Sequence, residues 1–171
     1  SPDFDWSHIE GVRDSKKLSE KAREKIFERA RELQQTSQLR FAVCTSSASY
    51  IDRYGIVPAI KRALAEALSR LGAKPKECTV LLDGGLSAPV EYVHQTTIIH
   101  GDDIEPIISL ASIVAKVTRD RLMRRLAPRY PAYGFESHKG YGTSNHLKAI
   151  AHSGLSDIHR TTFCSRILSS T

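Results

Sequence analysis

Long apolar runs, paired cysteines and repeated segments are all missing from this sequence. No stretch approaches the roughly 20 apolar residues that a membrane-spanning helix needs, and the N-terminus has no apolar signal-peptide core. Cys44, Cys78 and Cys164 lie far apart and form neither a Cys-x-x-Cys pair nor a zinc-ligand spacing with histidine. We therefore expect a cytoplasmic protein with reduced thiols, without a membrane span, a disulfide framework or a structural zinc.

Length and charge indicate one basic domain. With 171 residues and 40% hydrophobic content, the chain can bury one core, so we expect a single domain over residues 1–171. The formal charge is +6, and the excess is clustered. Residues 11–31 hold eight bases and four acids, whereas residues 116–129 hold six bases and one acid. Such clusters are typical of proteins that bind a phosphate backbone. In the first cluster, bases and acids alternate as they do on an ordinary solvated helix face, so both interpretations stay open there.

Residues 136–143, with the sequence Glu-Ser-His-Lys-Gly-Tyr-Gly-Thr, form the most informative short motif. Glycines on both sides of Tyr141 let the backbone approach a bulky partner while the ring stays exposed, as in platforms that stack on sugars and bases. An ordinary turn with a surface tyrosine gives the same pattern. The basic residues elsewhere in the chain favour the nucleic-acid interpretation.

Predicted helices and strands alternate along the chain, which indicates an α/β fold. The strand at Cys78–Leu82 is wholly apolar, as in strands that are buried on both faces. Apolar periodicity and capping residues predict helices over residues 19–35, 56–71, 106–127 and 144–152, and further strands at Leu39–Thr45 and Thr96–Ile99.

Two aspartates stand where predicted strands give way to loops. Asp83 follows an apolar strand and precedes two glycines, and Asp102 follows the segment Ile-Ile-His-Gly. Ligands of open α/β sheets bind at such strand ends, and carboxylates are natural ligands for Mg²⁺ or Mn²⁺. Each aspartate alone is equally typical of a turn or a helix cap. Together, beside a basic surface, they favour a metal-dependent nuclease.

The ordered set of motifs resembles the bacterial ribonuclease HII family over almost the whole chain. Any one of these motifs could arise by chance, whereas their order is highly specific. The matching segments are Asp14–Ser19, Ile51–Arg53, Leu82–Gly84, Gly101-Asp102, Ala111–Arg121, Tyr130-Pro131, Tyr133–Phe135, His138–Thr143, His159-Arg160 and Phe163.

The resemblance implies an RNase H-type α/β fold, a mixed sheet flanked by helices with a C-terminal helical part. It also implies an endonuclease, expected to be a monomer, that cuts the RNA strand of RNA/DNA hybrids and incises at ribonucleotides embedded in duplex DNA. Family enzymes use four carboxylates and two divalent ions, Mg²⁺ or Mn²⁺, and leave a 5′-phosphate and a 3′-hydroxyl. Asp83 and Asp102 match the third and fourth of these catalytic, metal-binding carboxylates.

Substrate contacts also carry over from the family by position. Tyr141 matches the residue that packs against the sugar beside the ribonucleotide. The positions that match phosphate-binding residues are Lys139, Ser15, Lys16 and Lys17.

One departure from the family pattern concerns the N-terminus. Family members begin with a strand that ends in Asp-Glu-Ala-Gly-Arg-Gly, which supplies the first two carboxylates and reads the 2′-hydroxyl, and a second strand follows. This chain begins at Ser1-Pro2-Asp3, after both. We therefore expect a truncated version of a longer protein, without nuclease activity on its own. The main alternative is a non-catalytic nucleic-acid-binding fragment; a purely structural domain leaves the bases and the Tyr141 motif unexplained.

Structural roles can account for four other polar residues. Asp120 lies inside a predicted helix between two arginines and is expected to pair with one of them rather than to bind metal. His138 either orients the Lys139 loop or hydrogen-bonds locally. His159 and Arg160 either contact phosphate or hold the C-terminus in place.

Overall fold

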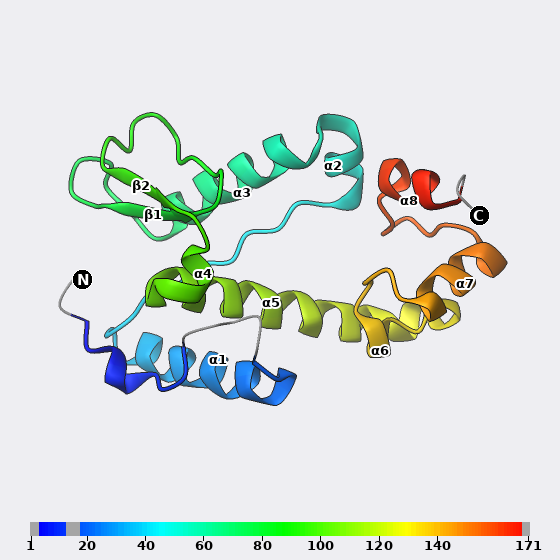
Figure 1. Ribbon diagram of the computed structural model, residues 1–171, viewed down its shortest axis with the longest axis horizontal. Coiled ribbons are helices and arrows are strands. Elements are labelled where there is room, and N and C mark those ends of the chain that lie inside the picture. The colour runs from blue at the N-terminus through cyan, green and yellow to red at the C-terminus, as the bar shows by residue number, and fades with distance from the viewer. Residues whose placement is uncertain (1–3, 13–17, 169–171) are drawn as a thin grey trace. The chain divides into compact units, whose positions relative to one another are not determined.

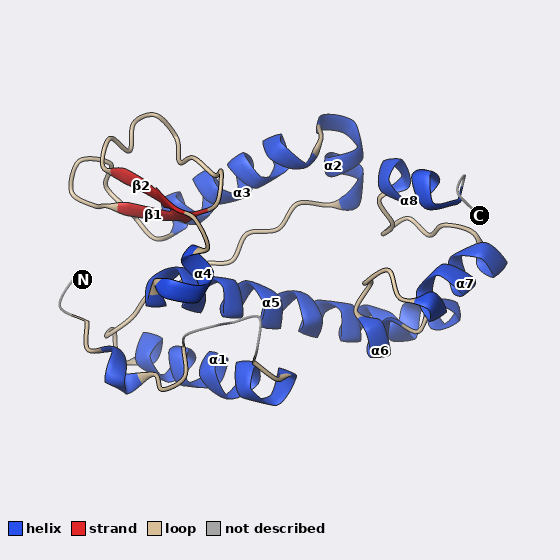
Figure 2. Cartoon of the chain, in the orientation of Figure 1, coloured by secondary structure: helices blue, strands red, loops and turns tan. Residues whose placement is uncertain are grey.

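A computed structural model describes residues 4–12 and 18–168 of the chain. The described residues form eight α-helices and two short strands (Figures 1 and 2). In chain order the elements are α1 (Glu20–Gln35), α2 (Ala48–Tyr54), α3 (Ile56–Arg70), β1 (Val80–Asp83), β2 (Gln95–Ile98), α4 (Gly101–Ile104), α5 (Pro106–Leu126), α6 (Phe135–His138), α7 (Ser144–Ser153) and α8 (Thr161–Leu168).

The chain divides into two compact units. The first contains residues 1–44 and 61–117, and the second contains residues 45–60 and 118–171. Helices α3 and α5 each begin in one unit and end in the other. The expectation of a single domain stays a prediction. Among the described residues, no helix is both long and apolar enough to cross a membrane.

The first unit has two apolar cores. In one of them, α1 packs against the first half of α5: Ala30, Leu33 and Ile113 are at most 1% exposed there. Ser19 caps α1 by accepting a hydrogen bond from the backbone N–H of Ala22, as its sequence position predicts. The second core joins β1 to α3 through Leu68, Val80 and Leu82, among others.

The sheet consists of β1 and β2, which run parallel with Val80 opposite Gln95 and Asp83 opposite Ile98. Both strands overlap their predicted segments: β1 begins two residues later and ends one residue later than predicted, and β2 lies one residue earlier. Burial of β1 on both faces is wrong, however: Val80 and Leu82 are buried, whereas Leu81 between them is only partly buried.

The predicted strand at Leu39–Thr45 is also wrong, because within the described ranges this segment joins no ladder. Its alternation is real, since Leu39, Phe41 and Val43 pack against the α1–α5 core. Two carbonyl oxygens of this segment accept hydrogen bonds from side chains and not from a neighbouring strand. Gln34 donates to the oxygen of Phe41 at 3.4 Å, and Arg70 donates to the oxygen of Val43 at 3.3 Å.

The second unit is helical. Its core gathers Phe135, Ile150 and Cys164 from α6, α7 and α8, with Ala127 and Tyr133 from the connecting 3-10 turns. Helix α8, which the sequence does not predict, begins against Asp52 of α2. The Asp52 carboxylate accepts hydrogen bonds from the backbone N–H and the hydroxyl of both Thr161 and Thr162.

Candidate active site

Asp83 and Asp102 are held at the carboxyl end of the sheet in the first unit. Asp83 is the last residue of β1, and Asp102 lies in the short helix α4 that follows β2. The backbone N–H of Gly101 donates to Oδ1 of Asp83 at 2.9 Å. This bond joins the residue before Asp102 to the end of the neighbouring strand, so the sheet itself brings the two aspartates together.

Gly101 makes this close approach possible. A Cβ atom at position 101 would lie 2.7 Å from Cδ1 of Ile108 and 3.5 Å from Oδ1 of Asp83. Real Cβ atoms do not approach a carbon as closely as the first distance. Glycine therefore lets α4 pack against α5 and β1 at once.

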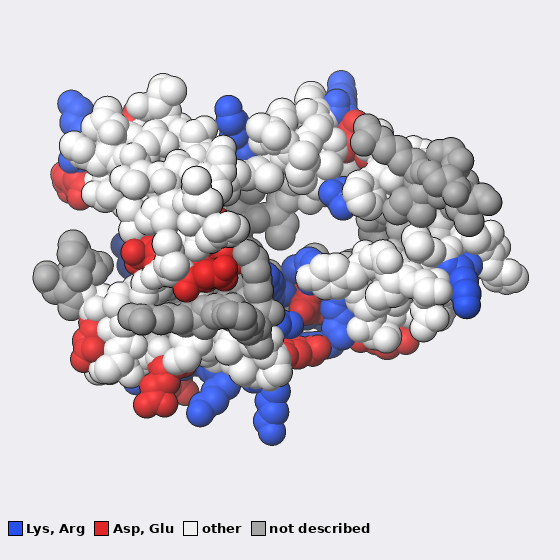
Figure 3. Space-filling view, viewed as in Figure 1, with Lys and Arg blue, Asp and Glu red and all other residues white. Residues whose placement is uncertain are grey.

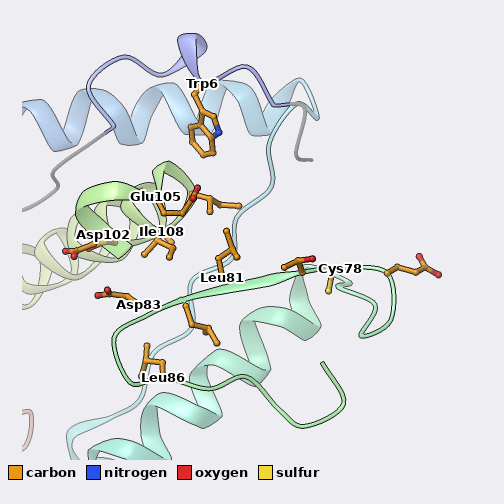
Figure 4. A pocket seen from close by; sticks show the side chains of 14 residues that line it. Trp6, Cys78, Leu81, Asp83, Leu86, Asp102, Glu105 and Ile108 are labelled. Atoms are coloured by element: carbon orange, nitrogen blue, oxygen red, sulfur yellow. The ribbon is translucent and has the colours of Figure 1, made fainter. Parts of the chain in front are cut away.

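Both aspartates line a cavity of about 890 Å³. Its other walls are the partly buried face of β1, the start of α5 and Trp6. Figure 4 shows the two carboxylates on the same side of this cavity, pointing in the same direction. Asp102 is buried, with 5% of its surface exposed.

The donor chemistry fits a hard divalent cation. A carboxylate can accept about four hydrogen bonds or metal contacts, so the single N–H of Gly101 leaves Asp83 with acceptor capacity. Carboxylate oxygens suit Mg²⁺ and Mn²⁺. In the part of the chain that the structure describes, no group of three or more His, Cys, Asp or Glu side chains could hold a metal. As candidate ligands, the two aspartates would make up only part of a metal site.

Glu105, which the sequence analysis did not select, lines the same cavity. Its side chain points toward Trp6 and away from the two aspartates in Figure 4. Its place in the acidic run of residues 102–105 was the only signal in the sequence.

Tyr141 lies in the second unit, in the loop between α6 and α7. Its side chain is 54% exposed, which agrees with either a stacking platform or a surface turn. The Arg119 guanidinium lies 4.2 Å from the centre of the Tyr141 ring and donates to its hydroxyl at 2.6 Å. Arg119 is in turn held by the buried carboxylate of Asp120, to which it donates two hydrogen bonds. The expected ion-pair role of Asp120 is thus confirmed, and Arg119 was missed because 22 residues separate it from Tyr141.

Lys139 and His138 precede Tyr141 in the same loop. The Lys139 ammonium donates to the carbonyl oxygens of Glu136 and Ser137 at 2.8 and 3.0 Å, so it stays beside its own loop. His138 bonds to the Tyr133 carbonyl and accepts from the N–H of Gly140, so its hydrogen bonds are local and one of them reaches the loop that carries Lys139. Ser15, Lys16 and Lys17, the other predicted phosphate contacts, lie outside the described residues.

The basic cluster at residues 116–129 does not form one stripe. Because successive helix residues are about 100° apart, the bases of α5 point around the helix rather than along one side. On the face in Figure 3, Lys and Arg side chains are scattered among Asp and Glu side chains. In α1, Arg29 and Arg31 pair with Glu32 and Glu28, as expected for a solvated helix face.

Comparison with known families decides what kind of protein this is. The family model described as Ribonuclease HII matches residues 8–166. The chain belongs to the ribonuclease HII family. A ribonuclease HII of Ruminiclostridium cellulolyticum is 45% identical over 155 residues, which cover 91% of this chain and 58% of the relative. A ribonuclease HII of Coxiella burnetii is 43% identical over 155 residues, which cover 91% of this chain and 73% of the relative.

A solved structure supports the ribonuclease HII fold. The chain resembles a structure titled as the PCNA:RNase HII complex from Archaeoglobus fulgidus, with a TM-score of 0.70 and 23% identity over 94% of this chain and 82% of that one. This likeness confirms the predicted RNase H-like α/β fold. The chain spans little more than half the length of several curated ribonuclease HII relatives that it matches.

Proposed function

We propose that this chain carries part of the active site of an endonuclease that cleaves the RNA strand of RNA/DNA hybrids and incises at single ribonucleotides in duplex DNA. The observation that carries the proposal is the Asp83–Gly101 hydrogen bond, which brings Asp83 and Asp102 to one cavity in a chain of the ribonuclease HII family. An acidic pair has no use in a protein that only binds a polyanion, because it repels phosphate.

In this proposal Asp83 and Asp102 hold Mg²⁺ or Mn²⁺. When bound, such ions lower the pKa of an attacking water and offset charge on the scissile phosphate and the leaving oxygen. The two side chains are suited to this task because the sheet and α4 fix their backbones before any ion binds. Two aspartates hold two dications poorly, so we expect the activity to need the two further carboxylates that the family resemblance implies.

We assign substrate contacts to residues of the second unit and of the N-terminal region. Tyr141 offers an exposed ring that Arg119 holds in place, and it is proposed to pack against the sugar beside the ribonucleotide. Lys139, Ser15, Lys16 and Lys17 are proposed to contact phosphates. The substrates are RNA/DNA hybrids and duplex DNA that contains ribonucleotides, and the protein is proposed to act as a monomer in the cytoplasm.

The test compares the 171-residue chain with a longer form that is preceded by a strand ending in Asp-Glu-Ala-Gly-Arg-Gly. Each is incubated with a duplex that carries one ribonucleotide, with Mn²⁺ or with a chelator. We expect the longer form to incise beside the ribonucleotide only when Mn²⁺ is present. We expect the shorter chain to bind the duplex weakly, with an affinity that falls as salt rises, and not to cut it.

The same assay separates the alternatives. Binding by both forms without incision by the longer one supports the competing role, a nucleic-acid-binding fragment. Metal-dependent incision by the 171-residue chain, in a preparation free of host nuclease, would mean that the active site lies elsewhere.

A further inference from the structure

Three histidines form a stacked cluster in the second unit that the proposed function does not use. His138 stacks on His146 with ring centres 4.4 Å apart, and His146 lies 5.3 Å from His159. The Phe135 ring packs against His146 and His159, with ring centres 5.5 and 5.7 Å apart. His146 and His159 are buried, with 5% and 7% of their surfaces exposed. Buried imidazoles need defined hydrogen-bond partners, and these partners fix where each proton lies.

A chain of hydrogen bonds assigns the tautomers of His159 and His146. The backbone N–H and the hydroxyl of Ser156 lie 3.0 and 2.7 Å from Nδ1 of His159. Because a backbone N–H can only donate, that Nδ1 is an acceptor, and the hydroxyl then donates to it as well. The proton of neutral His159 is then on Nε2, which lies 3.0 Å from Nε2 of His146 and donates to it. His146 therefore carries its own proton on Nδ1, 3.0 Å from the carbonyl oxygen of Tyr141.

This relay ends on the carbonyl of Tyr141, the residue that the proposed function places against the sugar. Gly140 precedes Tyr141 and is held by a second imidazole, because the N–H of Gly140 donates to Nδ1 of His138 at 3.2 Å. The Tyr141 hydroxyl is held from the other side by Arg119. Arg119 thus holds Tyr141 at its hydroxyl, and His146 holds it at its carbonyl. The same carbonyl also accepts from the N–H of Thr143 at 2.8 Å, and the Tyr141 N–H donates to the His138 carbonyl at 2.9 Å.

We propose that His146 is a positioning residue for Tyr141. It holds the Tyr141 carbonyl through Nδ1–H, and the contact with His159 keeps its ring in place while His146 is neutral. The inference rests on the proposed role of Tyr141 in substrate binding. An imidazolium has two N–H donors and no acceptor. Protonated His146 keeps its Nδ1–H, but its Nε2–H then faces the Nε2–H of His159, and these opposed donors push the ring away from the place in which it holds Tyr141.

The surroundings favour the neutral relay. Burial lowers the pKa of both His146 and His159 below the ordinary value of 6.5. For His146, the hydrogen bond to the Tyr141 carbonyl raises the pKa in part and the neighbouring His138 lowers it, with a net lowering. Asp157 acts in the opposite direction on His159. The other titratable groups of this core are two tyrosines and Cys164 on α8. The Tyr133 hydroxyl donates to the Gly154 carbonyl and the Tyr130 hydroxyl donates to Asp157, while Arg119 approaches Tyr141 from α5.

Because the pKa values of His146 and His159 are lowered, the relay should be lost at acid pH. A histidine whose pKa is lowered on folding keeps the neutral relay fully intact above its ordinary pKa and loses it as the pH falls through the lowered pKa. Affinity for a duplex with one embedded ribonucleotide should therefore fall on the acid side of pH 6.5 by more than general charge effects cause.

The experiment measures this affinity by fluorescence anisotropy, which does not require cleavage, between about pH 5 and pH 8. His146→Leu removes both hydrogen bonds but keeps an apolar side chain of similar size. His146→Asn keeps a donor near the place of Nδ1. We expect His146→Leu to weaken binding near neutral pH by about twofold to tenfold, as for one lost hydrogen bond. Its affinity should also fall less steeply at acid pH than that of the unsubstituted chain. His146→Asn should restore most of the affinity and should likewise lack the steep fall at acid pH.

Two further measurements make the outcome decisive. Nitrogen-15 NMR of the unsubstituted chain should show the proton of His146 on Nδ1 and that of His159 on Nε2; the reverse tautomers would overturn the inference whether or not any variant folds.

In a Tyr141→Ala background, His146→Leu should have no additional effect. If Tyr141→Ala weakens binding but His146→Leu does not, the inference fails alone. If Tyr141→Ala has no effect, the proposed role of Tyr141 fails and the inference fails with it.

Discussion

Oδ1 of Asp83 accepts a hydrogen bond from the backbone N–H of Gly101 at 2.9 Å, across a separation of 18 residues. The bond fixes the start of α4 against the end of β1, and Asp102 is the next residue along the chain. The position of one candidate ligand is therefore set by the backbone that carries the other. Substitutions that disturb this backbone should act on both aspartates together.

Gly101→Ala tests the packing that this arrangement needs. The added methyl group would lie 2.7 Å from Cδ1 of Ile108, so either the Ile108 side chain or α4 must shift. Overpacking of this kind costs about 1–3 kcal/mol of unfolding free energy, which urea denaturation can measure.

Ile108→Val supplies the matched control because it removes the methyl group that collides. Alone, it should cost about 0.5–1.5 kcal/mol. In the double variant Gly101→Ala, Ile108→Val, the loss should be smaller than the sum of the two single losses, since the clash is gone. Additive losses would show that the clash with Ile108 is not what excludes alanine.

Asp83→Asn and Asp102→Asn should each remove metal-dependent cleavage in the longer form of the protein, because each keeps the shape of the side chain and deletes its charge. Loss of an outer-shell partner lowers metal affinity or activity by about 10–100-fold, and loss of a direct ligand should cost more. Mn²⁺ titration calorimetry and the incision assay measure the two effects separately.

Asp103→Asn is the control for these variants. It removes one charge from the same short helix, at the residue that follows the candidate ligand Asp102. Its cleavage rate should stay near that of the unsubstituted protein. Near-normal cleavage by Asp102→Asn would remove the proposed metal site.

Tyr141→Ala and Tyr141→Phe separate the ring from its hydroxyl. Stacking on a nucleic acid is worth about 1–3 kcal/mol by alanine substitution, so Tyr141→Ala should lower affinity for the embedded ribonucleotide by that amount. Tyr141→Phe keeps the ring and the Arg119 guanidinium over its face, losing only the hydrogen bond to Arg119. It should retain most of the affinity, as binding curves would show. Equal losses in the two variants would exclude a stacking platform.

Lys139→Ala should weaken binding in a different way. If the ammonium exchanges its carbonyl partners for one phosphate, its removal should lower the slope of log K against log salt by about 0.9 and affect all duplex sequences equally. The measurement is a salt titration of duplex affinity. An unchanged slope would assign Lys139 to the loop structure alone.

Local signals in the sequence were enough for several elements of the fold. Ser19 caps α1 and Thr143 caps α7, each through a hydrogen bond to a backbone N–H three residues later, and both helices begin where the sequence predicts. The apolar stripe that starts at Ile56 likewise predicts α3, and Pro106 predicts the start of α5. In each of these cases the residues that decide the structure are neighbours in the chain.

Features that depend on distant residues could not be predicted. Helix α8 has β-branched residues in its first turn, and its N-terminal donors are met by Asp52, 109 residues earlier. The alternation at Leu39–Thr45 predicts a strand, but a strand also needs a partner, which the pattern cannot supply. At the candidate site, the sequence places both aspartates at strand ends, whereas the Gly101 contact and the Arg119–Tyr141 pair appear only in three dimensions.

The Asp52 carboxylate binds the first turn of α8, so the stability that this contact adds should depend on pH in the acid range. Hydrogen bonds from the hydroxyls of Thr162 and Thr161 lower the pKa of Asp52 from 3.8 to about 2. A carboxyl group whose pKa is lowered on folding contributes stability that is fully present above its ordinary pKa and is lost as the pH falls through the lowered value. Asp52→Asn should therefore destabilise the protein near neutral pH, and its difference from the unsubstituted chain should shrink between pH 3.8 and about 2.

Urea denaturation at a series of pH values measures this difference. Thr162→Val is the matched control: it removes one hydroxyl donor and leaves the Asp52 charge and the backbone donors of α8 in place. It should destabilise less than Asp52→Asn near neutral pH, and the remaining pH dependence should be weaker than in the unsubstituted chain. A difference between Asp52→Asn and the unsubstituted chain that persists undiminished at the lowest pH would mean that the Asp52 charge does not hold α8, and that the side chain acts by packing alone.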